Sequence, residues 1–96
     1  MFIIALTYCK PIEEVEKNLQ EHIRFLDKYY AQEKFILSGR KNPRTGGVIL
    51  AVNTTKEELA KIIQEDPFHQ HGIARYEITE FIPTRGDVKL SDFIES

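Results

Sequence analysis

Short apolar runs alternate with amphipathic segments along this chain. Residues 2–7 form a nearly continuous apolar run, which is typical of a central strand or of a strand covered on both faces. A helix is predicted from Pro11 to Ala31, because apolar residues recur there at spacings of three and four. They are Ile12, Val15, Leu19, Ile23, Leu26 and Tyr30. At about 100° per residue, His22 lies at the edge of this apolar stripe.

The next two apolar runs predict a hairpin. Residues 35–38 and 46–52 read as strands, and the connection 39–45 is rich in turn-forming residues and is expected to be exposed. Thr54 and Thr55 then precede two glutamates at the spacing of a capping box, which predicts the start of a second helix. This helix should end near Glu65, because Pro67 disfavours helical backbone at Asp66.

The last part of the chain predicts one further strand and a short helix. Apolar and polar residues alternate from Ile73, and the alternation breaks at Glu80 and Phe81, which indicates a bulge or the end of the strand. Residues 87–94 have an apolar side and predict a short terminal helix.

The predicted order βαββαβ is that of a ferredoxin-like α+β fold. Right-handed crossovers place both helices on one face of a four-stranded antiparallel sheet and leave the other face open. We expect a single domain over residues 1–96, with a core of about 1–83 and a C-terminal extension over 84–96. A small domain gains stability when a second copy covers an open face, so a homodimer is expected.

Composition narrows the class of protein. With 42% hydrophobic and 29% charged residues, the chain resembles ordinary globular proteins. A net charge of −2 provides no general attraction to nucleic acid or to an anionic membrane. Cys9 is the only cysteine, which excludes an internal disulfide and favours a reducing compartment. Residues 1–6 lack the basic start of a signal peptide, so the cytoplasm is expected.

His22 and Asp66 are the two candidates for chemistry. An imidazole at the edge of an apolar helical face can exchange a proton near neutral pH, or it can be a histidine satisfied within packed structure. Asp66 lies where the backbone changes direction before Pro67. Asp66 can take part in the same chemistry as His22, or it can be a turn aspartate that bonds a nearby backbone N–H.

The remaining polar clusters have weaker interpretations. Arg40, Lys41 and Arg44 lie on the hairpin connection, where they could bind a carboxylate or phosphate or form a solvated basic turn. His69 and His71 have a spacing that some metal sites use, but no third ligand is near in sequence, so no metal is expected. We interpret Cys9 as a strand-end residue, and Tyr8, Phe68 and Tyr76 as pocket or interface walls. No phosphate-binding loop or nucleophile elbow is present, so no cofactor is expected.

Several segments together resemble the YciI-like (YCII-related) family. They are Glu21-His22-Ile23-Arg24-Phe25-Leu26, Ile36-Leu37-Ser38-Gly39, Gly46-Gly47, and Asp66-Pro67-Phe68 followed by Gly72-Ile73. The resemblance implies a dimeric α/β barrel, in which two sheets pack face to face. It also implies that His22 and Asp66 form a His-Asp pair, with Ser38 at the rim of the pocket. Family members often carry a basic residue where this chain has Leu19 and a proline where it has Arg40.

The resemblance implies that one family member eliminates chloride from a chlorinated hydroxyquinone, whereas most members have no assigned reaction. We expect a small-molecule enzyme that uses the His-Asp pair for proton transfer in the elimination, isomerisation or hydrolysis of a small cyclic or carbonyl compound. Its catalytic residues would be His22 and Asp66, and its substrate contacts Ser38, Gly39, Arg40 and Phe68. The alternative is a non-catalytic dimer that uses the same cavity to bind a metabolite or to act as a regulator.

Overall fold

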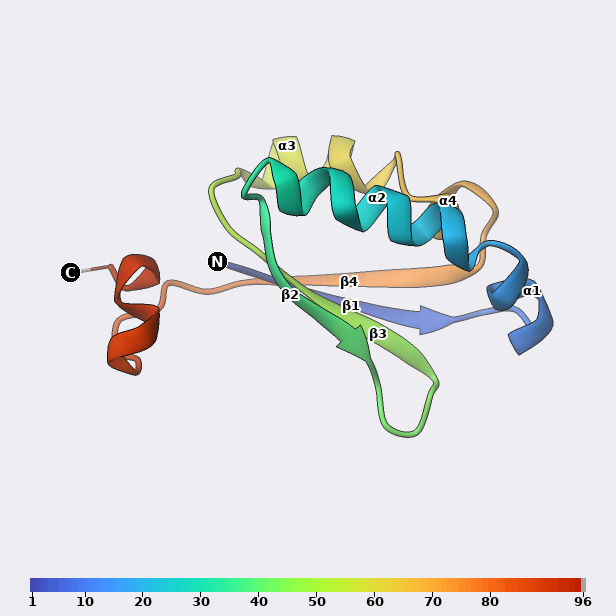
Figure 1. Ribbon diagram of the computed structural model, residues 1–96, viewed down its shortest axis with the longest axis horizontal. Helices are drawn as coiled ribbons and strands as arrows, with labels where there is room; N and C mark the ends of the chain where they lie inside the picture. Colours follow the sequence, from blue (N-terminus) through green and yellow to red (C-terminus); the bar gives the residue numbers. More distant parts are fainter. Residues whose placement is uncertain (96) are drawn as a thin grey trace.

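The structure of the protein is a computed structural model, which describes residues 1–95 (Figure 1). Its elements follow the chain in the order β1 (Phe2–Tyr8), α1 (Ile12–Lys17), α2 (Leu19–Ala31), β2 (Phe35–Arg40), β3 (Gly46–Ala51), α3 (Lys56–Ile63), α4 (Pro67–Gln70), β4 (Ala74–Glu80) and the 3-10 helix η1 (Val88–Phe93).

The four strands form one sheet in the order β2-β3-β1-β4, and each neighbouring pair is antiparallel. Helices α2, α3 and α4 lie on one face of this sheet (Figure 1). The predicted ferredoxin-like α+β fold is therefore confirmed.

The core lies between the sheet and the helices. Alternate residues of the central strand β1 point to this side, and Phe2, Ile4 and Leu6 are buried there. The helices supply most of the remaining buried apolar side chains, among them Val15, Phe25, Tyr29, Leu59, Ile62 and Phe68. The period-2 pattern of β1 thus sets which of its side chains face the helices.

The single long helix predicted over residues 11–31 is wrong, because Asn18 separates α1 from α2. The Asn18 side-chain amide donates to the Glu14 carbonyl at 2.9 Å, and its backbone leaves the helical region with φ −105° and ψ 3°. Asparagine side chains compete in this way for backbone groups that a continuous helix would use.

The break also changes which helical face is buried. Ile12 and Ile23 were expected in the buried stripe, but they are 41% and 45% exposed. His22, Phe25 and Tyr29 face the core instead, because α1 and α2 no longer share one helical phase. His22 therefore lies within the buried face of α2, and its predicted position at the edge of that face is wrong.

The second half of the chain follows its predicted signals closely. Thr55 caps α3 by accepting a hydrogen bond from the Glu58 amide at 3.1 Å. Asp66 adopts extended backbone before Pro67, as expected. The short helix α4 was not predicted; it begins at Pro67, whose fixed φ suits the first helical position.

One strand boundary differs from the sequence-based prediction. Strand β2 continues to Arg40, so Gly39 and Arg40 belong to the sheet and not to the hairpin connection. The predicted end of the last strand is confirmed, because β4 ends at Glu80, where the alternation breaks. The predicted terminal helix is the 3-10 helix η1, and its Val88 and Leu90 side chains are 82% and 47% exposed.

Candidate active site

Asp66 links the end of α3 to the start of α4 and is fully buried. It is the N-cap of α4, because its Oδ1 atom accepts a hydrogen bond from the Phe68 amide at 3.0 Å. The alternative interpretation of Asp66, as a turn aspartate that bonds a nearby backbone N–H, thus describes part of its role. The same oxygen also receives a bond from another helix.

That second bond comes from His22 on α2. His22 Nδ1 lies 2.7 Å from Asp66 Oδ1, and both side chains are buried. Since Asp66 Oδ1 already accepts from a backbone N–H, it acts as an acceptor toward Nδ1 as well. This arrangement assigns the proton to Nδ1 and leaves Nε2 as the imidazole nitrogen with a free lone pair.

Tyr76 on β4 contacts the other oxygen of the same carboxylate. Its hydroxyl donates to Asp66 Oδ2 at 2.5 Å. Burial and the adjacent Asp66 carboxylate raise the pKa of Tyr76 far above its ordinary value, so the phenol keeps its proton. Tyr76 was interpreted as a pocket or interface wall, and this donor role was missed because it depends on how β4 faces α4.

The ring of Phe68 covers one face of the His22 imidazole. The two ring centroids are 4.0 Å apart, and the planes differ by 5°. Asp66 and Phe68 are two residues apart in one short segment, with Pro67 between them. Asp66 contacts Nδ1 of His22, and Phe68 covers a face of its ring.

His22 lines a cleft of about 460 Å³ between α2 and the β2–β3 part of the sheet. Phe68 and the apolar side chains of Leu19, Ile23 and Leu26 also line it. Within residues 1–95, every buried side-chain nitrogen or oxygen has a hydrogen-bond partner. Nε2 of His22 has no partner among these residues, so it is not one of the buried atoms. Nε2 is therefore in contact with accessible space, and a ligand in the cleft can reach it.

The predicted substrate contacts Ser38, Gly39, Arg40 and Phe68 all line this cleft. Ser38 lies 2.6 Å from the Tyr30 hydroxyl, so one of its hydrogen bonds is already made within the protein. Arg44 also lines the cleft and pairs with Glu16 at 2.7 Å. Arg40 was expected to contact the substrate, whereas the place of Arg44 at the cleft was not predicted.

The other residues that the sequence singled out are not part of the His22–Asp66 pair. His69 packs edge-on against Tyr76 with ring centroids 5.6 Å apart, and His71 is exposed at the C-cap of α4. Cys9 is a free, exposed thiol just after β1. Among residues 1–95 no cluster of His, Cys, Asp or Glu has the arrangement of a metal site. Within the same residues no helix is long and apolar enough to cross a membrane.

The protein thus combines a ferredoxin-like α+β fold with a His-Asp pair beside a partly apolar cleft. The sequence matches the model of the YCII-related domain over residues 1–82. The chain therefore belongs to the YCII-related domain family, and the predicted family is confirmed. No curated protein sequence matches it.

A solved structure has the same fold. It is 5-chloro-2-hydroxyhydroquinone dehydrochlorinase from Burkholderia phenoliruptrix AC1100, in complex with 2,5-dihydroxybenzoquinone. The TM-score is 0.71 at 16% sequence identity, and the match covers 86% of this chain and 95% of that chain.

Proposed function

We propose that this protein is a small-molecule enzyme in which His22 transfers a proton and Asp66 holds the imidazole in the required tautomer. The observation that carries this proposal is the 2.7 Å contact between His22 Nδ1 and Asp66 Oδ1, in a cleft that leaves Nε2 accessible. A carboxylate at one imidazole nitrogen prepares the other nitrogen to act as a base.

The reaction begins when Nε2 of His22 takes a proton from a carbon next to a carbonyl group of the substrate. The electron pair of that C–H bond moves toward the carbonyl oxygen, and the imidazolium is stabilised by the adjacent Asp66 carboxylate. In an elimination, the electrons then expel an anionic leaving group. In an isomerisation, the imidazolium returns the proton to a different carbon.

Elimination is the reaction that the similar solved structure favours. That protein is a dehydrochlorinase, and its bound molecule, 2,5-dihydroxybenzoquinone, is a small cyclic carbonyl compound. A cleft of about 460 Å³ suits a compound of that size.

The test is proton transfer by the purified protein. Proton NMR in deuterium oxide follows C–H exchange of small cyclic ketones and lactones, and chloride release from 5-chloro-2-hydroxyhydroquinone follows elimination. We expect His22→Gln to lower the rate of C–H exchange or of chloride release, whichever the wild type catalyses, by about a hundredfold. His71→Gln, which changes an exposed histidine outside the cleft, is the matched control and is expected to keep the wild-type rate.

Equal rates in wild type and His22→Gln would contradict the enzyme proposal. Ligand binding that survives in His22→Gln, with no reaction in the wild-type protein, would instead support the non-catalytic metabolite-binding dimer.

We also propose that two copies pair through the open face of the sheet. A row of apolar residues crosses this face, because Leu50 on β3 lies opposite Ile3 on β1 and Leu37 on β2. Leu37 is 62% exposed in the single chain. Sedimentation at micromolar concentration should give the mass of a dimer, and Leu37→Asp should shift the mass toward the monomer. A wild-type monomer would contradict this pairing.

A further inference from the structure

We propose that the substrate carries a carboxylate group and that Arg40 binds it. This inference rests on the proposed function, because it assigns a substrate class to the same cleft. Arg40 is the last residue of β2 and lines the cleft together with His22.

The sheet register aims Arg40 toward the helices. Ser38 and Arg40 are two residues apart on β2 and therefore share one face. Ser38 lies opposite Ile49, which is buried under the helices, and Arg40 lies opposite Gly47. Gly47 has no side chain, so no neighbouring side chain on β3 shields the guanidinium from the cleft.

Arg40 differs from the other cations near the cleft in having no partner. Arg44 pairs with Glu16 at 2.7 Å, and Lys41 donates to the Thr7 hydroxyl at 3.2 Å. Among residues 1–95, the Arg40 side chain makes neither an ion pair nor a side-chain hydrogen bond. Its five N–H donors are therefore available to a ligand.

Among residues 1–95, Arg40 is the cation of the cleft lining that no contacting carboxylate balances. Glu16 pairs with Arg44 at 2.7 Å, and the Asp66 carboxylate behind His22 is buried and already accepts three hydrogen bonds. The guanidinium of Arg40 is therefore the group at the cleft that attracts an anionic ligand.

Apolar surface lies beside this charge. Ile23 lines the cleft and is 45% exposed, and Leu19 and Leu26 extend the same wall. A ligand that fits both features has an apolar ring and one anionic group. A single free guanidinium matches the charge of one carboxylate, which it can bind through two parallel hydrogen bonds.

The experiment compares benzoate with benzamide, a neutral compound of the same shape. Backbone amide chemical shifts are followed in a nitrogen-15-labelled wild-type protein during titration with each compound, with phenyl phosphate as a third probe. We expect benzoate to bind roughly tenfold more tightly than benzamide, and this difference to decrease with added salt.

Three variants distinguish binding by the Arg40 side chain from a general effect of positive charge. Arg40→Gln should weaken benzoate binding roughly tenfold, and Arg40→Lys should lose part of the affinity, because lysine keeps the charge without the planar fork. Lys41→Gln removes the same charge one residue away and outside the cleft lining, so benzoate affinity should stay at the wild-type value.

Four results would overturn the inference: no benzoate binding to the wild type, equal affinity for benzoate and benzamide, tighter binding of phenyl phosphate than of benzoate, or equal losses in Arg40→Gln and Lys41→Gln. The binding test distinguishes this inference from the proposed function, because it requires no reaction. Benzoate selectivity that is lost in Arg40→Gln would support the role of Arg40 even if no proton transfer is found, whereas proton transfer without benzoate selectivity would remove only the role of Arg40.

Discussion

The imidazole of His22 and the ring of Phe68 lie almost parallel, with their centroids 4.0 Å apart. Asp66 holds the Nδ1 edge of the same imidazole. The Asp66-Pro67-Phe68 segment therefore restricts both the rotation of the ring and the choice of tautomer. Each of these contacts can be removed separately.

Phe68→Leu tests the stacking contact. Leucine keeps an apolar side chain at this buried position but cannot stack on the imidazole, so we expect a loss of about 1–2 kcal/mol in the free energy of unfolding. The proton-transfer rate should fall because the imidazole is less restrained. Urea unfolding and the exchange assay measure the two effects. Phe93→Leu makes the same change in η1, and an equal loss of rate there would contradict a specific role for Phe68.

Asp66→Asn tests the carboxylate at the centre of the site. An amide cannot accept from all three donors, which are His22 Nδ1, the Phe68 amide and the Tyr76 hydroxyl. We expect a loss of about 2–3 kcal/mol in stability, together with a large loss of proton transfer. Asp87→Asn is the matched control, since Asp87 caps η1 at the Lys89 amide at 2.9 Å but is exposed. Similar losses from both changes would argue against a special role of Asp66.

Tyr76→Phe removes one donor from the same carboxylate and leaves the ring in place. The expected cost is about 1 kcal/mol in the free energy of unfolding. In the wild type, the raised pKa of Tyr76 predicts that this phenol does not ionise while the protein is folded. Tyrosine absorbance during an alkaline titration measures this ionisation. In Tyr76→Phe, the number of tyrosines that ionise only at the highest pH should be one lower than in the wild type. Ionisation of Tyr76 near its ordinary pKa would contradict the prediction.

Glu65→Gln tests a polar contact near the C-terminal end of α2. Lys28 and Tyr29 donate to the Glu65 carboxylate at 2.6 Å and 2.5 Å, and these bonds hold the pKa of Glu65 below its ordinary value of 4.5. Folding thus favours the ionised form, so the stabilisation is complete above pH 4.5 and is lost as the pH falls through the lowered pKa.

The contact is nearly half exposed, so its contribution is modest. We expect Glu65→Gln to lower the free energy of unfolding by about 0.5 kcal/mol at pH 7. The difference from wild type should disappear in acid. Denaturant unfolding of both proteins between pH 7 and pH 3 measures it, and a difference that does not vary with pH would refute the assignment.

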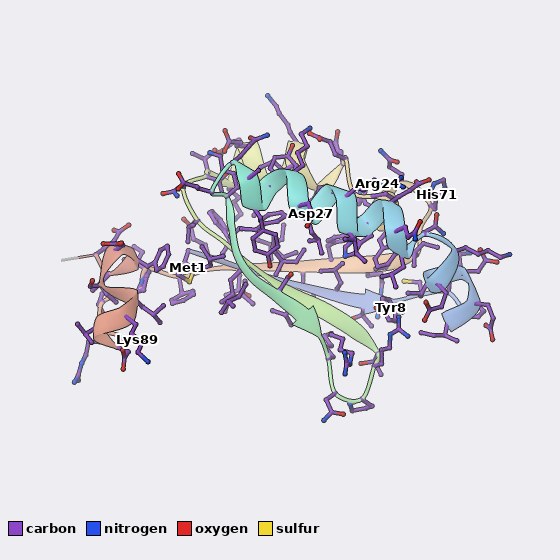
Figure 2. All side chains as sticks on the ribbon, viewed as in Figure 1. Met1, Tyr8, Arg24, Asp27, His71 and Lys89 are labelled. Atoms are coloured by element: carbon purple, nitrogen blue, oxygen red, sulfur yellow. The ribbon has the colours of Figure 1, made fainter. Side chains whose placement is uncertain are left out.

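Deletion of residues 84–96 tests the expected extent of the core. Lys89 on η1 lies at the opposite end of the molecule from Tyr8, which lines the cleft (Figure 2). The hydrogen bonds of the described part of this segment stay within it or reach only Pro83, as in the 2.8 Å bond from the Glu95 amide. We therefore expect a folded protein with wild-type proton transfer. Loss of the folded state on deletion would show that the core extends past residue 83.

The order of elements could be predicted because its signals are local. The alternation in β1, the Thr55 cap and the effect of Pro67 on Asp66 each depend on neighbours in sequence. These signals were sufficient for the ferredoxin-like fold. The Asn18 break was also a local signal, but the regular spacing of apolar residues on both sides of it concealed the change of helical phase.

The contacts of the candidate site are long-range, and no local pattern encodes them. Spacing along the chain says nothing about the distance between His22 and Asp66, which are 44 residues apart; the family resemblance alone suggested that they pair. The Tyr76 hydroxyl and the free guanidinium of Arg40 acquire their surroundings only when β4 faces α4 and β2 faces α2. Residue types and periodicity thus determine the elements and the candidates, whereas packing of the helices on the sheet determines which candidates meet and which nitrogen of His22 remains accessible.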